Sequence, residues 1–416
     1  MAVFKPFKAL RPVPDKAAEI ASPPYDVMDS DEARIEVQKN PLSYLHVEKP
    51  EVDLPPGTDL YDPAVYAKAR ENLDNYVQQG YMKQDAEPMF YIYRQTMDGR
   101  EQTGLVGLTS VDEYMSGVIR KHEFTRADKE ADRIKHVDAC DAHASPVFFT
   151  YRHQETVDEI VSRVMQRKAP VYDFLADDGI GHTLWLMDDP ADISAIQKAF
   201  AGLDYLYVAD GHHRTASAAK VGLLRRERNP GYTGDEEFNF FMAVIFSDNQ
   251  LKIFDYNRVV KDLNGNSLET FMYRVGEKFE VTQIQQPGPY RPQKPHEIGM
   301  YIAHSWYRLV PKPGSWDASN VVASLDVSIL QNNLLHPILG IGDPRRDKRI
   351  DFVGGIRGLD ELVRRVNSGR EVVAFAMYPT SVRELMNIAD AGEIMPPKST
   401  WFEPKLRSGL FIHPLS

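Results

Sequence analysis

The pattern of hydrophobic and polar positions along the chain predicts a mixed α/β protein. Short apolar runs rich in β-branched and aromatic residues predict strands, and apolar positions three or four residues apart predict helices. The predicted strands cover residues 88–94, 102–111, 144–151, 181–187, 203–209, 239–246, 251–255, 300–304, 306–310, 350–353 and 372–377. The predicted helices cover residues 62–80, 155–168, 190–201, 268–279, 358–368 and 381–390.

Turn signals join some of these segments into pairs. Asp98-Gly99 predicts a hairpin between the strands at 88–94 and 102–111. The segments at 239–246 and 251–255 are expected to pair through the short polar link that separates them. The character of the chain changes near residue 262, and a loop rich in Pro, Gln and Gly follows at 284–297. We therefore expect two domains, residues 1–260 and residues 261–416.

One stretch combines a predicted strand, a tight turn and a predicted helix. The apolar run at 203–209 leads into Asp210-Gly211, and an alanine-rich helix is expected to begin near Thr215. The first backbone N–H groups of a helix lack partners within the helix, and the helix dipole favours negative charge there. This stretch therefore predicts an anion site, to which the Gly211 backbone and Thr215 contribute.

The side chains at this turn can carry chemistry. Arg214 can bind a phosphate through two hydrogen bonds, and His212 and His213 can transfer protons near neutral pH. Asp210 is a candidate metal ligand and a candidate proton acceptor. The alternative is an ordinary strand–turn–helix junction with solvated polar residues. We favour the functional interpretation because five capable residues fall together.

Two other stretches supply candidate bases. Two prolines hold the chain extended before Tyr25 and Asp26, so Asp26 is either a candidate base or the cap of the next helix. Glu123, next to His122, follows the end of an expected strand and is a second candidate base. Most of the charged run at 126–136 is expected to form the solvated face of a helix, although Asp132 and Arg133 could supply another carboxylate and another phosphate-binding side chain.

A local basic cluster lies near the C-terminus. Lys398, Ser399 and Lys405 belong to it and are candidate phosphate-binding residues. In an acidic protein such a cluster suggests an anionic ligand, and the alternative is a solvated extension.

Composition excludes several functional classes. The net charge of -11 over 416 residues argues against a broad nucleic-acid surface. No apolar run is long enough for a membrane helix, and the N-terminus lacks the apolar core of a signal peptide, so we expect a cytoplasmic protein. The only cysteine, Cys140, is expected to be structural because acidic neighbours oppose thiolate formation. Walker A, G-x-G-x-x-G and H-E-x-x-H motifs are absent.

The motifs together resemble a known superfamily. Asp210-Gly-His-His-Arg214 resembles the nucleotide-binding box of the ParB/sulfiredoxin superfamily. The chain is similar to a large bacterial and archaeal family within it, designated ten-fifteen among the domains of unknown function. Further stretches carry this likeness: Phe7-Lys-Ala-Leu-Arg-Pro12, Ala21-Ser-Pro-Pro-Tyr-Asp-Val27, His122-Glu-Phe-Thr125, Ser145-Pro-Val-Phe148 and Met395-Pro-Pro-Lys-Ser-Thr400.

The resemblance implies a ParB/sulfiredoxin-like core with large insertions, and a C-terminal α/β domain that adds a basic tail to the site. Sulfiredoxin has its reactive cysteine where this chain has His212, so sulfinic-acid repair is not expected. No helix-turn-helix for DNA follows the box. Free L-serine kinases of the superfamily share an Asp-Gly-His-x-Arg box.

The resemblance to those kinases implies phosphoryl transfer on a small hydroxyl metabolite such as serine or phosphoserine, by a kinase or a phosphatase. Mg²⁺ is the expected cofactor, with ADP or ATP for a kinase. The alternative is a nucleotide-binding regulator without catalysis. The sequence leaves the oligomeric state open.

Overall fold

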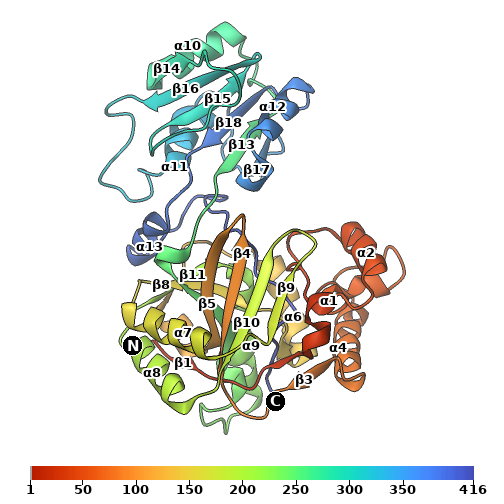
Figure 1. The fold of residues 1–416 in the computed structure, drawn as a ribbon. Helices are drawn as coiled ribbons and strands as arrows, with labels where there is room; N and C mark the ends of the chain where they lie inside the picture. The colour runs from red at the N-terminus through yellow and green to blue at the C-terminus, as the bar shows by residue number, and fades with distance from the viewer. Residues whose placement is uncertain (1) are drawn as a thin grey trace. The chain divides into compact units, whose positions relative to one another are not determined.

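The computed structural model describes residues 2–416 and divides the chain into two compact units (Figure 1). The first unit comprises the chain up to Leu251 together with Pro404–Ser416, and the second comprises Lys252–Glu403. The second unit is therefore an insertion, after which the chain returns to the first. The mixed α/β class predicted from the sequence is confirmed.

A nine-stranded mixed sheet forms the centre of the first unit. Its order is β6-β11-β8-β12-β5-β4-β10-β9, with β1 paired to β5. The pairs β11–β6 and β12–β8 are parallel, and the remaining pairs are antiparallel. The strands are β1 (Phe4–Lys5), β4 (Phe90–Met97), β5 (Arg100–Ser110), β6 (Ile119–Arg120), β8 (Val147–Tyr151), β9 (Tyr172–Leu175), β10 (Gly181–Met187), β11 (Leu206–Asp210) and β12 (Phe240–Ser247).

Helices pack against this sheet. The helix α9 contacts β8, β11 and β12 and packs against α6, while α7 packs against α8. The bounds are α1 (Ala17–Ile20), α2 (Ser30–Lys39), α3 (Leu45–Glu48), α4 (Pro63–Gln78), α5 (Val111–Ser116), α6 (Ala127–Cys140), α7 (Glu155–Arg167), α8 (Pro190–Ala201) and α9 (His212–Arg228). Every residue of β8, and every residue of β12 after its first, is buried, which is typical of strands covered on both faces.

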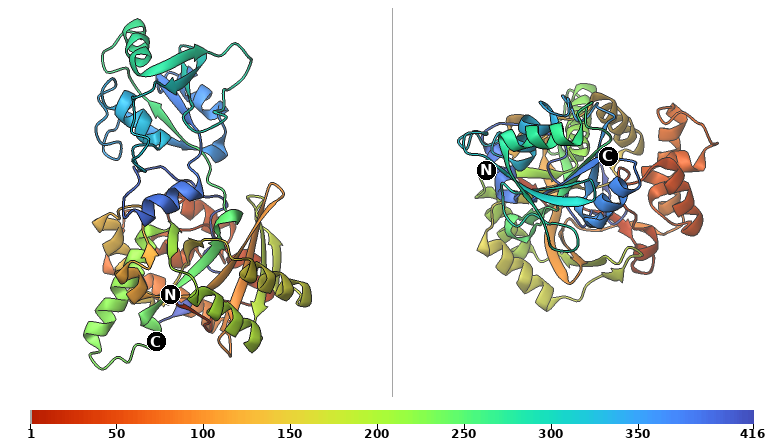
Figure 2. Two further views of the ribbon diagram at one scale, coloured as in Figure 1. Left: turned by 90° about the vertical axis from the view of Figure 1, so that its left-hand side faces the viewer. Right: turned by 90° about the horizontal axis from the view of Figure 1, so that it is seen from above.

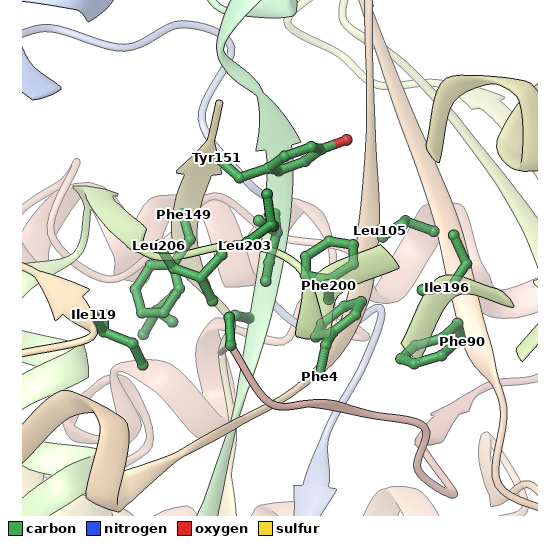
Figure 3. Packing of buried hydrophobic residues seen from close by; sticks show 14 of the residues in the cluster. Phe4, Phe90, Leu105, Ile119, Phe149, Tyr151, Ile196, Phe200, Leu203 and Leu206 are labelled. Carbon is green, nitrogen blue, oxygen red and sulfur yellow. The ribbon is translucent and has the colours of Figure 1, made fainter. Parts of the chain in front are cut away.

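Aromatic side chains hold the centre of this unit together (Figure 3). The ring of Phe4 stacks on those of Phe90 and Phe200, with centroids 4.7 and 4.4 Å apart. Full burial of one such side chain stabilises the fold by about 1.5–3 kcal/mol. The N-terminal strand is thus tied to β4 and α8.

The last residues of the chain complete the first unit. The strand β19 (His413–Pro414) pairs with β7 (Ala142–His143), and β2 (Leu10–Pro12) pairs with β3 (Met82–Gln84). Isolated bridges join Leu10 to Ile412 and Ser22 to Ser408. These pairings hold the segment from Pro404 onward in place.

The second unit is a six-stranded antiparallel sheet with its own apolar core (Figure 2). The strand order is β14-β16-β15-β18-β13-β17. The strands are β13 (Tyr256–Val260), β14 (Phe279–Gln283), β15 (Ile298–Ile302), β16 (Ser305–Pro311), β17 (Ile350–Gly354) and β18 (Val373–Met377). The helices are α10 (Leu268–Lys278), α11 (Asp326–Leu330), α12 (Asp360–Asn367) and α13 (Val382–Asp390).

One predicted strand pair is wrong. Residues 251–255 do not pair with β12, whose two edges are already occupied by β5 and β8. A short 3₁₀ turn at Asp248–Gln250 ends β12, and the next strand, β13, belongs to the second sheet. Hydrophobicity alone could not show that β12 had no free edge.

The two longest helices of the first unit are α4 and α9. Both carry polar and charged residues along their length and are not continuous apolar segments. Among residues 2–416, no helix combines the length and the apolar character needed to cross a lipid bilayer.

Candidate functional site

The turn from β11 into α9 depends on one glycine. Gly211 has φ 84° and ψ 35°, a left-handed conformation that glycine adopts at little cost. A Cβ at this position would lie 3.2–3.3 Å from guanidinium atoms of Arg214. The helix begins immediately afterwards, at His212, so the start predicted near Thr215 is too late. His212, His213 and Arg214 therefore lie on the first helical turn.

Arg214 is held over this turn. Its side chain is buried, with 9% of the residue exposed, and Nη1 donates a hydrogen bond of 2.8 Å to the carbonyl of Pro146. Burial alone would lower the pKa of Arg214, but Asp26 and Asp210 hold it above the ordinary value. Nε has no hydrogen-bond partner among residues 2–416. A fixed cation with an unused donor, next to a helix N-terminus, can bind an anion.

Asp210 forms an ion pair with Lys405 from the C-terminal segment. Lys405 Nζ lies 2.9 Å from one carboxylate oxygen, and the other oxygen accepts the Gly211 N–H at 2.8 Å. Burial alone would raise the pKa of Asp210, but Lys405 and Arg214 hold it well below its usual range. The structure thus brings three predicted site residues, Asp210, Arg214 and Lys405, into one charged group.

His122, Glu123 and His212 form a second cluster beside the turn. Their ligand atoms lie within 4.8 Å of one another, and His212 Nδ1 lies 3.5 Å from a Glu123 carboxylate oxygen. The two imidazole rings meet edge to face, 4.4 Å between centroids. Burial lowers the pKa of His212 to about 4 and that of His122 well below its usual range, so both rings are neutral at pH 7. Neutral imidazoles beside a carboxylate can hold a metal ion.

Asp26 lies close enough to His213 and Arg214 to influence the pKa of each. The Arg126 N–H donates to His213 Nδ1 at 3.4 Å, and burial lowers the pKa of His213 while Asp26 opposes that shift. Asp26 is exposed, so a substrate can reach it. The alternative role for Asp26, capping the next helix, belongs instead to Asp29, which caps α2 in a capping box.

The remaining predicted phosphate-binding residues have other contacts. The Thr215 hydroxyl donates to the carbonyl of Gly211 at 3.0 Å, which stabilises the turn. Lys398 and Ser399 belong to the second unit, where the Ser399 hydroxyl donates to Pro396 and the Lys398 carbonyl accepts from Arg258. Their role in binding phosphate stays a prediction.

The charged run on α6 is only in part the solvated helix face that the sequence predicted, because Glu130, Asp132, Arg133 and His136 are buried. Asp132 and Arg133 are buried and joined by an ion pair of 2.9 Å, and the Arg133 guanidinium lies 4.2 Å from the centre of the Tyr25 ring. Glu48, also buried, lies close enough for Arg133 and Arg214 to oppose the rise that burial causes in its pKa. A cavity of about 20 Å³, space for roughly one water molecule, is lined in part by Glu48, Arg133 and Arg214.

Sequence reasoning named Asp132 and Arg133 as possible site residues, but it missed Glu48 and the burial of this layer. Glu48 follows an apolar residue and precedes a lysine, a pattern that surface helices share, so no local signal marked it. On α6, Arg133 lies three residues before His136 and four before Val137. This spacing places the three side chains on one face of the helix, and it was the usable sign that this face is buried.

The fold is that of an α/β protein with a buried arginine at a strand-to-helix turn. The chain belongs to the family described as "Protein of unknown function (DUF1015)", whose model matches residues 4–328. The wider likeness to the ParB/sulfiredoxin superfamily stays a prediction. A search of curated proteins found no match.

Three solved structures show the range of distant likeness. A mutant free serine kinase in complex with AMP is 13% identical, with 71% of this chain and 86% of that chain covered and a TM-score of 0.36. A conserved hypothetical protein from Pyrococcus furiosus is 14% identical, with 73% and 93% covered and a TM-score of 0.36. A C-terminally truncated SbnI from Staphylococcus aureus is 12% identical, with 73% and 85% covered and a TM-score of 0.39.

Proposed function

We propose that this protein transfers a phosphoryl group to or from a small hydroxyl metabolite, with L-serine or phosphoserine as the substrate pair. The observation that carries the proposal is the position of Arg214, buried over Gly211 at the start of α9 with Nε unused within residues 2–416. Phosphoryl transfer depends mainly on positioning and charge neutralisation, and this arrangement supplies both.

The residues divide into those that bind charge and those that move protons. Arg214, the first N–H groups of α9 and Lys405 bind the phosphate and neutralise its charge. Asp26, exposed and close to His213, accepts the proton of the attacking hydroxyl group or water. Glu123 is the alternative base, and His213 or His212 shuttles the proton from the base to the leaving group.

Mg²⁺ fits this site only if the ion is coordinated by both the protein and the substrate. Both oxygens of Asp210 are engaged, one by Lys405 and one by the Gly211 N–H, and so a metal ion at Asp210 has to compete with the lysine. Mg²⁺ commonly uses one or two carboxylates and completes its shell with water and substrate phosphates. When bound, the ion would neutralise charge on the phosphates of ADP or ATP.

The choice of serine rests on the sequence box. Asp210-Gly-His-His-Arg214 resembles the box of the free L-serine kinases, and the same parts can serve either direction of transfer. A kinase needs a nucleotide in the second position, whereas a phosphatase needs water there.

Phosphorus NMR on the full chain with Mg²⁺ tests the proposal. One sample holds phosphoserine alone, and the other holds serine with ADP or ATP. Inorganic phosphate in the first sample identifies a phosphatase, and phosphoserine in the second identifies a kinase. Arg214→Ala should abolish either signal, whereas Arg228→Ala, at the exposed far end of the same helix, should retain it. Activity that survives Arg214→Ala, or nucleotide that binds without turnover, would reject catalysis at this turn.

A further inference from the structure

We propose that His122, Glu123 and His212 bind a divalent transition-metal ion of the zinc type, at a site distinct from Mg²⁺ on a nucleotide. The three side chains come from two segments, the end of β6 and the start of α9, which β6–β11 pairing brings together. This site is argued from ligand geometry and from the burial of the two histidines, without reference to phosphoryl transfer.

The distances fit a metal-binding set. Two ligand atoms about 2.1 Å from a tetrahedral zinc ion lie about 3.4 Å from each other. His212 Nδ1 and the Glu123 carboxylate oxygen are 3.5 Å apart. All three ligand atoms fall within 4.8 Å of one another, so a shift of up to about 1.4 Å by the most distant ligand completes the set.

The burial of the two histidines is the second observation. His122 is 1% exposed and His212 is 5% exposed. Within the part of the chain that the structure describes, neither ring nitrogen of His122, nor Nε2 of His212, has a hydrogen-bond partner. An unsatisfied buried polar group costs about 1–3 kcal/mol, and native proteins rarely leave several side by side. Metal ligation would remove part of this cost.

The ligand types select the kind of metal. Imidazole nitrogens suit Zn²⁺, Co²⁺ and Fe²⁺, whereas Mg²⁺ and Ca²⁺ prefer oxygen ligands. Three protein ligands are the number found in catalytic zinc sites, which keep a fourth position for water or substrate. Glu123 is about half exposed, and so the cluster has one side that solvent can reach. We therefore expect an accessible metal site rather than a closed structural one.

Metal titration of the full-length protein tests the site. The protein is stripped with a chelator, then titrated with Zn²⁺ by calorimetry and with Co²⁺ by visible absorption, without substrate or nucleotide. We expect one Zn²⁺ per chain and a Co²⁺ spectrum typical of low coordination number. His122→Gln and Glu123→Gln should each weaken binding at least about 10-fold, since losing a group that only supports a ligand already costs roughly 10- to 100-fold.

His213→Gln is the matched control, because His213 neighbours His212 on α9 and is outside the cluster. It should bind Zn²⁺ as the parent protein does. Absence of binding, unchanged affinity in both test variants, or equal loss in the control would each overturn the assignment. Glu123→Gln keeps the test decisive if His122→Gln fails to fold, since Glu123 is partly exposed. Phosphoryl transfer is scored separately with Arg214→Ala, a residue outside the cluster, so a failed metal site and a failed phosphoryl-transfer site give different results.

Discussion

The guanidinium of Arg214 shows what a single residue contributes to the anion site. One nitrogen anchors the side chain to the Pro146 carbonyl, and the plane of the group covers Gly211. A lysine is a point charge on a flexible stem, without the planar set of donors that an arginine presents. A lysine at position 214 would therefore keep the positive charge but lose the placement of the guanidinium donors.

Arg214→Lys should keep the charge and lose the geometry. We expect kcat/KM for phosphoryl transfer to fall about 100-fold, the scale of removing one preorganised donor from developing charge. Steady-state kinetics with the active substrate pair measures this. Arg228→Lys on the same helix is the control and should stay within about twofold of the parent protein. A similar small change in Arg214→Lys would show that charge alone suffices.

Buried histidines set the response of the first unit to acid. His182 lies between the Tyr93 hydroxyl, at 2.7 Å, and the Arg407 guanidinium, at 3.2 Å. Burial, followed by Arg407, lowers the pKa of His182 to about 3. The unfolded chain binds a proton at His182 below about pH 6.5, whereas the folded chain does not until about pH 3. Stability from this residue is therefore lost as the pH falls through that window.

In His182→Gln, unfolding should no longer be accompanied by the uptake of a proton at this residue. Between pH 6 and pH 4, the slope of unfolding free energy against pH should decrease by up to about 1.4 kcal/mol per pH unit. Urea denaturation at several pH values measures the slope. Thr183→Ala, on the next residue of β10, should change stability without changing the slope. An unchanged slope in His182→Gln would show that another group takes up the proton.

The sequence predicted much of the site at this scale, but not its support. The box at residues 210–214 was recognisable because its chemistry is contiguous, and Lys405 was found as part of a basic cluster. The pairing of Lys405 with Asp210 spans 195 residues, and no local pattern encodes it. Glu48 was missed because burial depends on how helices pack against one another.

At the scale of elements, the contact of α9 with its neighbours depends on a second glycine. A Cβ on Gly222 would lie 2.6 Å from the Phe238 carbonyl oxygen and 2.9 Å from a methyl group of Val111. The helix therefore lies closer to this backbone than any side chain permits. Hydrophobic periodicity predicted most strands and helices correctly. It could not show that both edges of β12 are occupied or that α9 lies so close to the Phe238 backbone, because both depend on how the elements pack.

Gly222→Ala should destabilise the protein although alanine favours helices. We expect a loss of about 1–3 kcal/mol, because the contact with a backbone oxygen forces α9 to shift. Gly276→Ala in α10 is the matched control, since a Cβ there meets nothing within 4 Å of the described neighbours. It should stabilise by about 0.5–1 kcal/mol. Chemical denaturation measures both. A stabilising Gly222→Ala would contradict the close approach.

At the scale of the whole molecule, the inserted unit has features of an independent domain. Its core is formed by its own residues, and its two ends are paired, with a hydrogen bond of 2.8 Å from the Phe254 N–H to the Trp401 carbonyl. A bridge between Ile253 and Phe402 continues this pairing. Adjacent termini allow an inserted domain to fold without the chain on either side.

Residues 252–403 should therefore fold when expressed alone. We expect native-like circular dichroism and a single cooperative urea transition, with an m-value suited to its size. Removing the paired ends by starting at residue 256 and ending at residue 400 should lower the midpoint. A broad, non-cooperative transition for 252–403 would show that its core needs the rest of the chain.

The late position of Lys405 in the chain has a consequence for biosynthesis. Its partner Asp210 is made 195 residues earlier. At about 5–20 residues per second, roughly 10–40 s separate the two on the ribosome. During that interval Asp210, whose side chain is about 30% exposed in the finished protein, has Arg214 but not Lys405 as a counter-charge. A stalled or truncated product that ends before Pro404 would keep Arg214 and both histidines of the turn, yet it would never acquire the balanced charge of the finished protein.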